Sequence, residues 1–370
     1  MSTEVKNKKI SKEELIAIRN SVQSLCKDFP GEYWRKLDEK REYPTSFVNA
    51  MTESGFLAVL IPERYGGAGL GLEAACAILE EIHKNGCNAG ACHAQMYTMG
   101  TILKHGSDKQ KKEWLPKIAS GEIRLQAFGV TEPTSGTDTL SLKTMATKKN
   151  KEYLISGQKI WTSRAEHSDY MVLLARTTPI DKIQKKGKGL SVFMVDMREA
   201  LMNGMTIRPI KTMMNHSSTE VFMDNIKVPE ENLIGEEGNG FKYILDGMNA
   251  ERILIAAECI GDARYFIDRA SKYSSDREVF GNPIGKNQGV QFPIARAYVQ
   301  MRAAEALVSE AIELFDSGEP CGSEANMAKM AASEASWFAG DTCIQTYGGY
   351  GFAEEYDIER KFRETRLYQV

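Results

Sequence analysis

The chain has 370 residues, of which 42% are hydrophobic and 26% are charged, and its formal net charge is −3 at pH 7. A chain of this length is too long to fold around one small hydrophobic core, so two or three domains are expected. The near-neutral charge argues against a nucleic-acid-binding protein, which usually has a basic domain. No apolar run reaches the ~20 residues that a membrane-spanning helix needs, so we expect no membrane insertion.

The N-terminal residues and the cysteines favour a cytoplasmic location. The start, Met-Ser-Thr-Glu-Val-Lys-Asn-Lys-Lys, has no apolar signal core and is not an Arg- and Ser-rich transit sequence. Seven cysteines, an odd number scattered through helix-like segments, are typical of reduced core thiols. His83, Cys87, Cys92 and His93 are close in sequence, but their spacing matches no compact zinc pattern. We predict no metal site.

Residues 1–125 have the pattern of a helical domain. Ser11 and Glu14 have the spacing of a capping box, and an apolar helical face follows them. Pro44 is placed to begin a second helix, and Gly55 to end one. Further helices are predicted over 72–84, 88–105 and about 108–118.

Residues 126–238 change to short β-rich runs separated by polar turns, which predicts a central β domain. From residue 239 the pattern returns to long helices, at roughly 239–275, 287–317 and 320–347, with a last one from 354. The sequence therefore predicts an α+β multidomain fold with domains at 1–125, 126–238 and 239–370.

Two segments of the β domain carry the most information. Residues 127–138 read as a strand that leads into a turn rich in hydroxyls and glycine. Residues 157–163 read as a strand that places Trp161 between short polar neighbours. A flat, electron-poor ring system requires hydrogen-bond donors along its polar edge and an aromatic face against it. The pair predicts a site for such a ring.

Together these segments resemble the flavin-binding strands of the acyl-CoA dehydrogenase family. The turn at 276–281 is similar to the family's Arg-x-x-Phe-Gly turn, and the turn at 345–351 to its Gln-x-x-Gly-Gly-x-Gly turn. The resemblance extends over essentially the whole chain. It implies a helical N-terminal domain, a central β-barrel or β-sandwich domain and a C-terminal four-helix bundle.

The resemblance also implies bound FAD. Residues of the two strands line the isoalloxazine, and residues of the two turns bind the dinucleotide half of a neighbouring subunit's FAD. The strand residues are Phe128, Val130, Thr131, Trp161 and Ser163, and the turn residues are Arg277, Phe280, Gln288, Gln345, Gly348 and Gly349.

The implied reaction is α,β-dehydrogenation of an acyl-CoA thioester, in which a carboxylate removes the Cα proton. Asn249-Ala-Glu251-Arg252 opens the first long C-terminal helix, and the isovaleryl- and long-chain-type members carry their catalytic glutamate in such a Glu-Arg pair. Glu251 is therefore the expected base, and Arg252 an active-site cation. Many other members place the glutamate just beyond the segment that here ends at Val370, so that possibility stays open.

The substrate contacts implied by the resemblance are Thr137, at the CoA pyrophosphate, together with Asn249 and Arg252. Gln95, Met96 and Met99 lie on the helix that usually walls the acyl cavity. Methionines there suggest an adaptable apolar tunnel, although core packing explains them equally well. The acyl chain cannot be named from these residues.

The expected partners are acyl-CoA, an electron-transfer flavoprotein and further copies of the chain in a tetramer built as a pair of dimers. Three rival functions are compatible with the same scaffold: an acyl-CoA oxidase, a CoA-linked enoyl reductase and a non-catalytic flavin-binding relative. Glu251 argues against the last of these.

Overall fold

A computed structural model describes residues 10–185 and 187–370. The chain groups into two compact units, each assembled from separate stretches. The sheet unit comprises Tyr43–Gly69 and Gly90–Met248; the helical unit comprises the described residues up to Glu42, Leu70–Ala89 and Asn249–Val370. The three-domain division stays a prediction. Residues 1–9, on which the expected cytoplasmic location partly depends, lie outside the described residues.

The sheet unit combines helices with one mixed sheet. Its helices are α3 (Thr45–Glu53), α5 (Gly90–His105), α6 (Asp108–Ser120) and α7 (Met197–Met202), with the first residues of α8. Its strands are β1 (Ala127–Gly129), β2 (Met145–Lys149), β3 (Glu152–Ser163), β4 (Tyr170–Arg176), β5 (Leu190–Asp196), β6 (Met205–Pro209), β7 (Ser218–Pro229) and β8 (Leu233–Ile234).

The sheet has the order β6-β7-β3-β2-β4-β5-β8, and β1 pairs with β4 in parallel. Strands β4 and β5 are buried almost throughout, which explains their near-continuous apolar sequences. Strand β3 instead alternates, and Tyr153 and Ile155 point into the core. The apolar core of the unit therefore lies against β3, β4 and β5.

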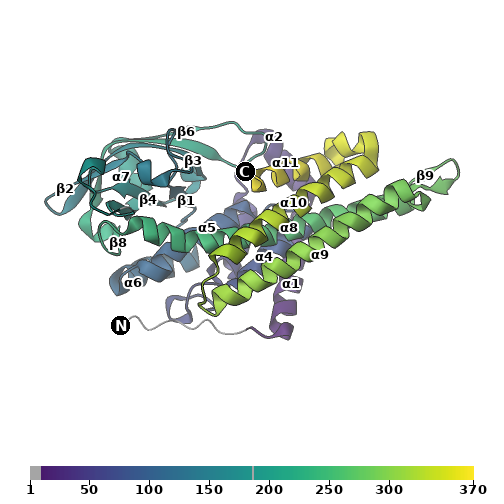
Figure 1. Ribbon diagram of the computed structural model, residues 1–370, viewed down its shortest axis with the longest axis horizontal. Coiled ribbons are helices and arrows are strands. Elements are labelled where there is room, and N and C mark those ends of the chain that lie inside the picture. The colour runs from purple at the N-terminus through teal and green to yellow at the C-terminus, as the bar shows by residue number, and fades with distance from the viewer. Residues whose placement is uncertain (1–9, 186) are drawn as a thin grey trace. The chain divides into compact units, whose positions relative to one another are not determined.

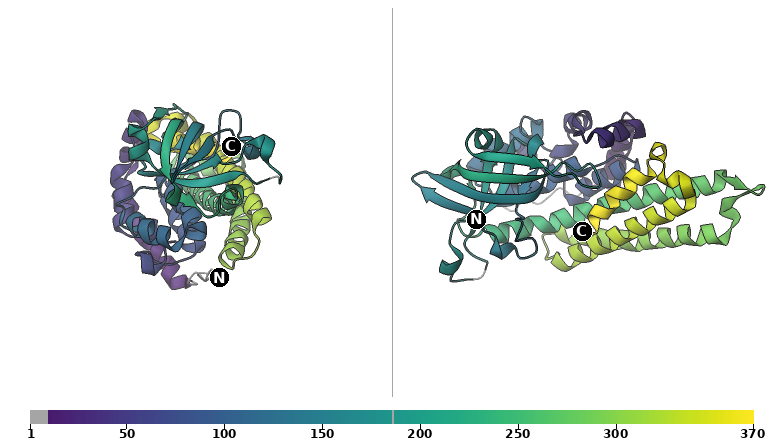
Figure 2. Two further views of the ribbon diagram at one scale, coloured as in Figure 1. Left: turned by 90° about the vertical axis from the view of Figure 1, so that its left-hand side faces the viewer. Right: turned by 90° about the horizontal axis from the view of Figure 1, so that it is seen from above.

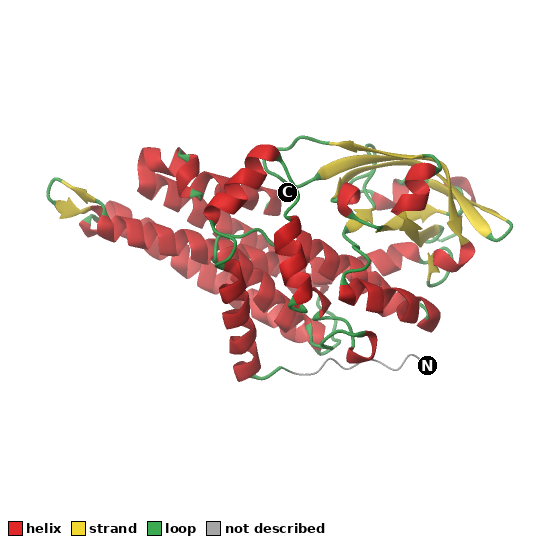
Figure 3. Cartoon of the chain, turned by 180° about the vertical axis from the view of Figure 1, so that it is seen from behind, coloured by secondary structure: helices red, strands yellow, loops and turns green. Residues whose placement is uncertain are grey.

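The helical unit contains mainly helices, of which α9 and α10 run side by side (Figures 1 and 2). A short hairpin, β9–β10, projects beyond the ends of the long helices (Figure 3). The elements are α1 (Lys12–Cys26), α2 (Gly31–Lys40), α4 (Leu72–Lys84), α8 (Gly240–Asp276, from Asn249 onward), β9 (Glu278–Val279), β10 (Asn282–Pro283), α9 (Gln288–Asp316), α10 (Gly322–Tyr347) and α11 (Ile358–Tyr368).

The α+β multidomain fold is confirmed. The capping box at Ser11 and Glu14 is present at the start of α1. Gly55 follows α3 with a φ of 76°, the left-handed conformation that glycine adopts at helix ends. None of the described helices has the length and apolar character needed to cross a membrane.

Candidate active site

Trp161 lies on strand β3 and presents its indole outward. Its side chain is 56% exposed and its φ is +61°. The pairing of β3 with β7 is irregular between Ile160 and Thr162, and such a bulge redirects the side chain of the residue within it. A bulky residue at positive φ persists only where its surroundings hold it there. Strand β3 therefore offers an aromatic face to a ligand at a strained backbone position.

The loop that follows β1 is tied to β3 next to this tryptophan. The Ile160 N–H donates to the Thr131 carbonyl at 3.0 Å, and the Lys159 ammonium donates to the Val130 carbonyl at 2.9 Å. The structure thus places the predicted isoalloxazine residues at the ends of β1 and β3: Phe128, Val130, Thr131, Trp161 and Ser163.

A buried ion pair also holds the same loop. Lys159 is fully buried, and its Nζ lies 2.9 Å from Oε1 of Glu132, which is 5% exposed. The Glu132 carboxylate also accepts the N–H groups of Lys143 at 2.6 Å and Thr144 at 2.9 Å. Burial lowers the pKa of Lys159 to about 8, although Glu132 opposes this effect. Burial alone would raise the pKa of Glu132, but Lys159 and these hydrogen bonds hold that pKa below its ordinary value.

A second buried cation, Arg176 at the end of β4, anchors the far part of the loop. Its Nε donates to the Leu142 carbonyl at 3.0 Å and its Nη2 to the Leu140 carbonyl at 2.5 Å. Burial lowers the pKa of Arg176. Thr137, the predicted contact of the CoA pyrophosphate, lies in the exposed stretch between the two anchored parts. We call residues 130–144 the anchored loop.

Helix α5 contacts the strand that begins this loop. The rings of Tyr97 and Phe128 meet edge to face, with centroids 5.3 Å apart. Gln95, Met96 and Met99 on the same helix are buried. Among the described residues, neither amide atom of the Gln95 side chain has a hydrogen-bond partner. A buried amide without a protein partner usually bonds to a polar ligand atom or to water. That Gln95, Met96 and Met99 line the acyl cavity stays a prediction.

The predicted base lies well inside a helix. Helix α8 begins at Gly240, so the expectation that the Asn249–Arg252 stretch opens this helix is wrong. Helical periodicity continues upstream of Asn249. The helix macrodipole acts within the first turn, and Glu251 lies beyond that turn, so the dipole does not act on its carboxylate. Glu251 and Arg252 are half-buried, and the Arg252 guanidinium donates to the Asn249 side chain at 3.3 Å. The structure therefore links two of the three predicted residues directly.

The two predicted dinucleotide-binding turns meet at one end of the helical unit. The Arg277 guanidinium lies over the Tyr350 ring, 5.9 Å from its centroid. Phe280, at the tip of the β9–β10 hairpin, is fully exposed at a φ of +53°. The remaining predicted residues of this group are also exposed there: Gln288, Gln345, Gly348 and Gly349.

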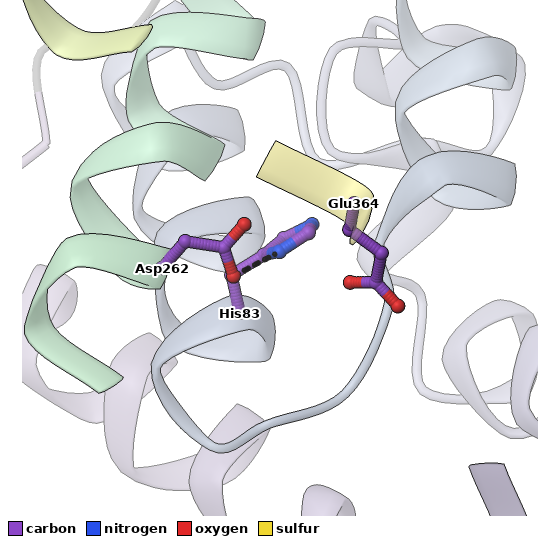
Figure 4. A group of neighbouring side chains, drawn as sticks. All are labelled: His83, Asp262 and Glu364. Carbon is purple, nitrogen blue, oxygen red and sulfur yellow. Dashed lines mark hydrogen bonds and ion pairs between the residues drawn. The ribbon is translucent and has the colours of Figure 1, made fainter. Parts of the chain in front are cut away.

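The helical unit also contains a buried charge cluster that sequence reasoning missed. His83 of α4, Asp262 of α8 and Glu364 of α11 point toward one another (Figure 4), and their ligand atoms lie within 4.8 Å. The Lys361 ammonium lies among them, 2.6 Å from Asp262, 2.7 Å from Glu364 and 2.9 Å from Nδ1 of His83. It also donates to the Cys87 carbonyl at 3.0 Å.

The imidazole of His83 is contacted on both ring nitrogens. The Ala89 N–H donates to Nε2 at 3.1 Å, and Nδ1 lies 2.9 Å from Oδ1 of Asp262 and 2.9 Å from the Lys361 ammonium. The Lys361 ammonium also contacts two carboxylates and one carbonyl. The ammonium occupies the place that a metal ion would take, and the absence of a metal site stays a prediction.

Of these buried charged residues, the burial of Lys159 could be predicted from the sequence, but the charge cluster could not. Period-two alternation from Tyr153 and Ile155 also points Lys159 inward, so its burial was predictable from the strand pattern. The charge cluster has no such signal, because His83 and Asp262 are 179 positions apart and Lys361 is 278 positions from His83.

Three family models match consecutive stretches of the chain. They are described as the N-terminal, middle and C-terminal domains of acyl-CoA dehydrogenase and match residues 12–122, 127–226 and 238–370. An acyl-CoA dehydrogenase from Bacillus subtilis is 34% identical, covering 97% of this chain and 94% of that protein. A 3-(aryl)acrylate reductase from Clostridium sporogenes is 31% identical, covering 94% of this chain and 93% of that protein.

Solved structures have the same fold over nearly the full length. A chain from the electron transferring flavoprotein of Acidaminococcus fermentans has a TM-score of 0.91 at 30% identity and covers 98% of this chain and 94% of that chain. The glutaryl-coenzyme A dehydrogenase–glutaryl-CoA complex has a TM-score of 0.88 at 31% identity, with coverages of 98% and 92%. This chain therefore belongs to the acyl-CoA dehydrogenase family, whose members are oxidoreductases acting on CH–CH groups.

Proposed function

We propose that the chain catalyses FAD-dependent α,β-dehydrogenation of an acyl-CoA thioester to the trans-2-enoyl-CoA. The observation that carries this proposal is the exposed Trp161 indole, held at positive φ beside the loop that contains Thr131. A strained, outward aromatic next to backbone donors suits a planar ring with a polar edge.

The residues at the ends of β1 and β3 fit FAD. Within the described chain the Thr131 N–H donates to no backbone carbonyl, so it is available to the polar edge of the ring system. Phe128 lies on β1, and Ser163 is the last residue of β3. When bound, FAD supplies the acceptor for the hydride that leaves Cβ of the substrate. The exposed Arg277, Phe280, Gln288, Gln345, Gly348 and Gly349 would hold the dinucleotide half of a neighbouring subunit's FAD.

Glu251 acts as the base that removes the Cα proton. A carboxylate can abstract this weakly acidic proton when water is excluded and the developing enolate is stabilised by hydrogen bonds. Arg252 supplies a neighbouring positive charge, and its bond to Asn249 limits its orientation. The support for this assignment is the Glu-Arg pair on a long helix, in the register of the isovaleryl-type members.

The proposed substrate contacts rest on the same resemblance to the family. Thr137 meets the CoA pyrophosphate from the exposed part of the anchored loop, and Met96 and Met99 contact the acyl chain from α5. The unpartnered amide of Gln95 favours an acyl pocket with at least one polar position over a purely apolar tunnel.

The physiological electron acceptor is an electron-transfer flavoprotein, and the chain assembles as a tetramer of two dimers in the cytoplasm. The fully exposed Phe280 at the hairpin tip supports an intersubunit role, because a large apolar side chain is seldom left entirely in water. The similarity to a solved chain described with the electron transferring flavoprotein of Acidaminococcus fermentans supports an electron-transfer flavoprotein as the electron acceptor.

An anaerobic panel of acyl-CoA substrates, with a dye as electron acceptor, tests this proposal. We expect the FAD-loaded protein to be bleached by at least one saturated acyl-CoA and to release the enoyl product. A protein that takes up no FAD, or whose flavin no acyl-CoA reduces, would overturn the proposal.

The second candidate function is reduction of an activated double bond. The similarity to a 3-(aryl)acrylate reductase favours a reductase over an acyl-CoA oxidase or a non-catalytic flavin-binding protein. Dithionite-reduced enzyme separates the cases, because a reductase is reoxidised rapidly by an enoyl or aryl acrylate substrate and an oxidase by air. A dehydrogenase of the proposed type reacts slowly with oxygen and rapidly with an electron-transfer flavoprotein.

A further inference from the structure

Lys159 is a buried cation whose position is not explained by stability. It has no exposed surface, and two of its contacts are the Val130 carbonyl and the Glu132 carboxylate, both at 2.9 Å. Burying an ion pair costs desolvation energy that the attraction seldom exceeds, and an apolar pair of the same size is often as stable. A lysine at this place therefore suggests a role in the site above it.

The Val130 carbonyl and the Thr131 N–H are the two ends of one peptide group. An ammonium bonded to the carbonyl withdraws electron density from that group and makes its N–H a stronger hydrogen-bond donor. Thr131 N–H is the group that the proposed function assigns to the polar edge of the flavin. The positive charge of Lys159 thus acts on the ring through this peptide group, while Glu132 is its counter-ion.

We propose that Lys159 is a positioning residue that raises the reduction potential of the bound flavin by polarising the Val130–Thr131 peptide group. This inference rests on the proposed function, because it requires FAD at the ends of β1 and β3. Reduction adds negative charge to the flavin, so a stronger donor at its edge stabilises the reduced form more than the oxidised form.

The variant Lys159→Met tests the proposal, because it keeps the length of the side chain and removes the charge. We expect FAD to dissociate about tenfold more readily, and the ratio of reduced to oxidised flavin at a fixed potential to fall about tenfold, which is about 30 mV for a two-electron couple. Lys159→Arg keeps the charge and should restore most of the potential.

Arg176→Met is the matched control. It removes the other buried cation that contacts the anchored loop, whose hydrogen bonds go to the Leu140, Leu142 and Thr178 carbonyls. We expect this variant to bind FAD more weakly but to leave the potential of the bound flavin unchanged. A fall in potential equal to that of Lys159→Met would assign the effect to loop disorder and overturn the proposal.

The pH dependence provides a test that needs no apolar variant. Among the described residues, the ionisable group that faces Lys159 is Glu132 on the anchored loop, which Arg176 of β4 also attracts. The pKa of Lys159 is lowered to about 8, so its charge is lost as the pH rises through 8. The wild-type potential should fall across this range relative to that of Lys159→Arg, whose guanidinium does not titrate.

A purely structural lysine would leave the potential unaffected by this titration. Stability does not separate the two roles, because the folded-state pKa of Lys159 lies below its unfolded value and its contribution to stability rises with pH between about 8 and 10.4 in either case. FAD-bound Lys159→Met at the wild-type potential, or parallel pH profiles of wild type and Lys159→Arg, would overturn this inference alone. Failure of the wild type to bind FAD would overturn the proposed function as well.

Discussion

At the scale of single residues, Trp161 combines an unfavourable backbone with a large exposed side chain. A non-glycine residue in the left-handed region costs about 1–2 kcal/mol, and exposure of the indole brings no burial in return. This combination is expected where a residue is kept for a ligand and not for the fold. Stability and cofactor binding should therefore respond in opposite directions to its replacement.

Trp161→Gly should raise the free energy of unfolding of the FAD-free protein by about 1 kcal/mol, because glycine adopts this φ without strain. The same change should weaken FAD binding by at least about tenfold, because the stacked face is lost. Chemical denaturation and FAD titration measure the two effects. Trp161→Phe, which keeps an aromatic face, is the control; unaltered FAD affinity in the glycine variant would remove Trp161 from the site.

Glu251 allows an equally direct test. Glu251→Gln keeps the shape of the side chain but cannot accept the Cα proton, so flavin bleaching by acyl-CoA should slow by at least ~10² while substrate still perturbs the flavin spectrum. Glu251→Asp retains a carboxylate at shorter reach and should lose less. Stopped-flow absorbance measures both rates, and a wild-type rate in Glu251→Gln would show that another residue is the base.

At the scale of secondary structure, the buried charge cluster fixes helix α11 to α4 and α8. Burial disfavours the charged form of Asp262, but its contacts with His83 and Lys361 hold its pKa below the ordinary value. Burial also disfavours charged Lys361, yet Asp262 and Glu364 hold the pKa of this lysine above the ordinary value. Stability from Asp262 is lost only as the pH falls through its lowered pKa, and that from Lys361 only as the pH rises through its raised pKa. Neither of these two contributions changes around neutral pH.

Lys361→Met should lower the free energy of unfolding by about 3–5 kcal/mol, because it leaves the Asp262 and Glu364 carboxylates buried without their cation. Lys84→Met is the matched control on α4, since Lys84 pairs with Glu81 partly in solvent and such a pair contributes less than about 1 kcal/mol. Urea denaturation at pH 7 measures both. Equal losses in the two variants would show that the cluster does not stabilise the fold.

The limits of several helices could be predicted from the sequence. Helices α4, α9 and α10 begin and end within two residues of the predicted limits, because their apolar periodicity is long and their ends carry glycine or polar residues. The β9–β10 hairpin has two-residue strands, too short for any period. The flavin strands are recognisable from their motifs, whereas the charge cluster depends on contacts between distant segments, which a single sequence does not encode locally.

At the scale of the whole molecule, the exposed turns at one end of the helical unit bear on assembly. If Arg277 binds a neighbouring subunit's FAD, Arg277→Ala should weaken FAD retention and subunit association together, each by about tenfold or more. Lys286→Ala is a suitable control, because Lys286 is an exposed cation of the same region whose ammonium donates to the Asn282 side chain. Analytical ultracentrifugation with flavin absorbance detection measures both effects. A stable monomer with full flavin occupancy would contradict the assignment of this turn to a neighbouring subunit's cofactor.

The exposure of Trp161 also gives the chain an intrinsic optical label. Only four tryptophans are present, and Trp34 and Trp114 are 5% and 3% exposed. The emission of the exposed indole is therefore shifted to the red of theirs, and a flavin stacked on it would quench that component first. Occupancy of the site can then be followed by fluorescence in the native protein, without a dye or a tag.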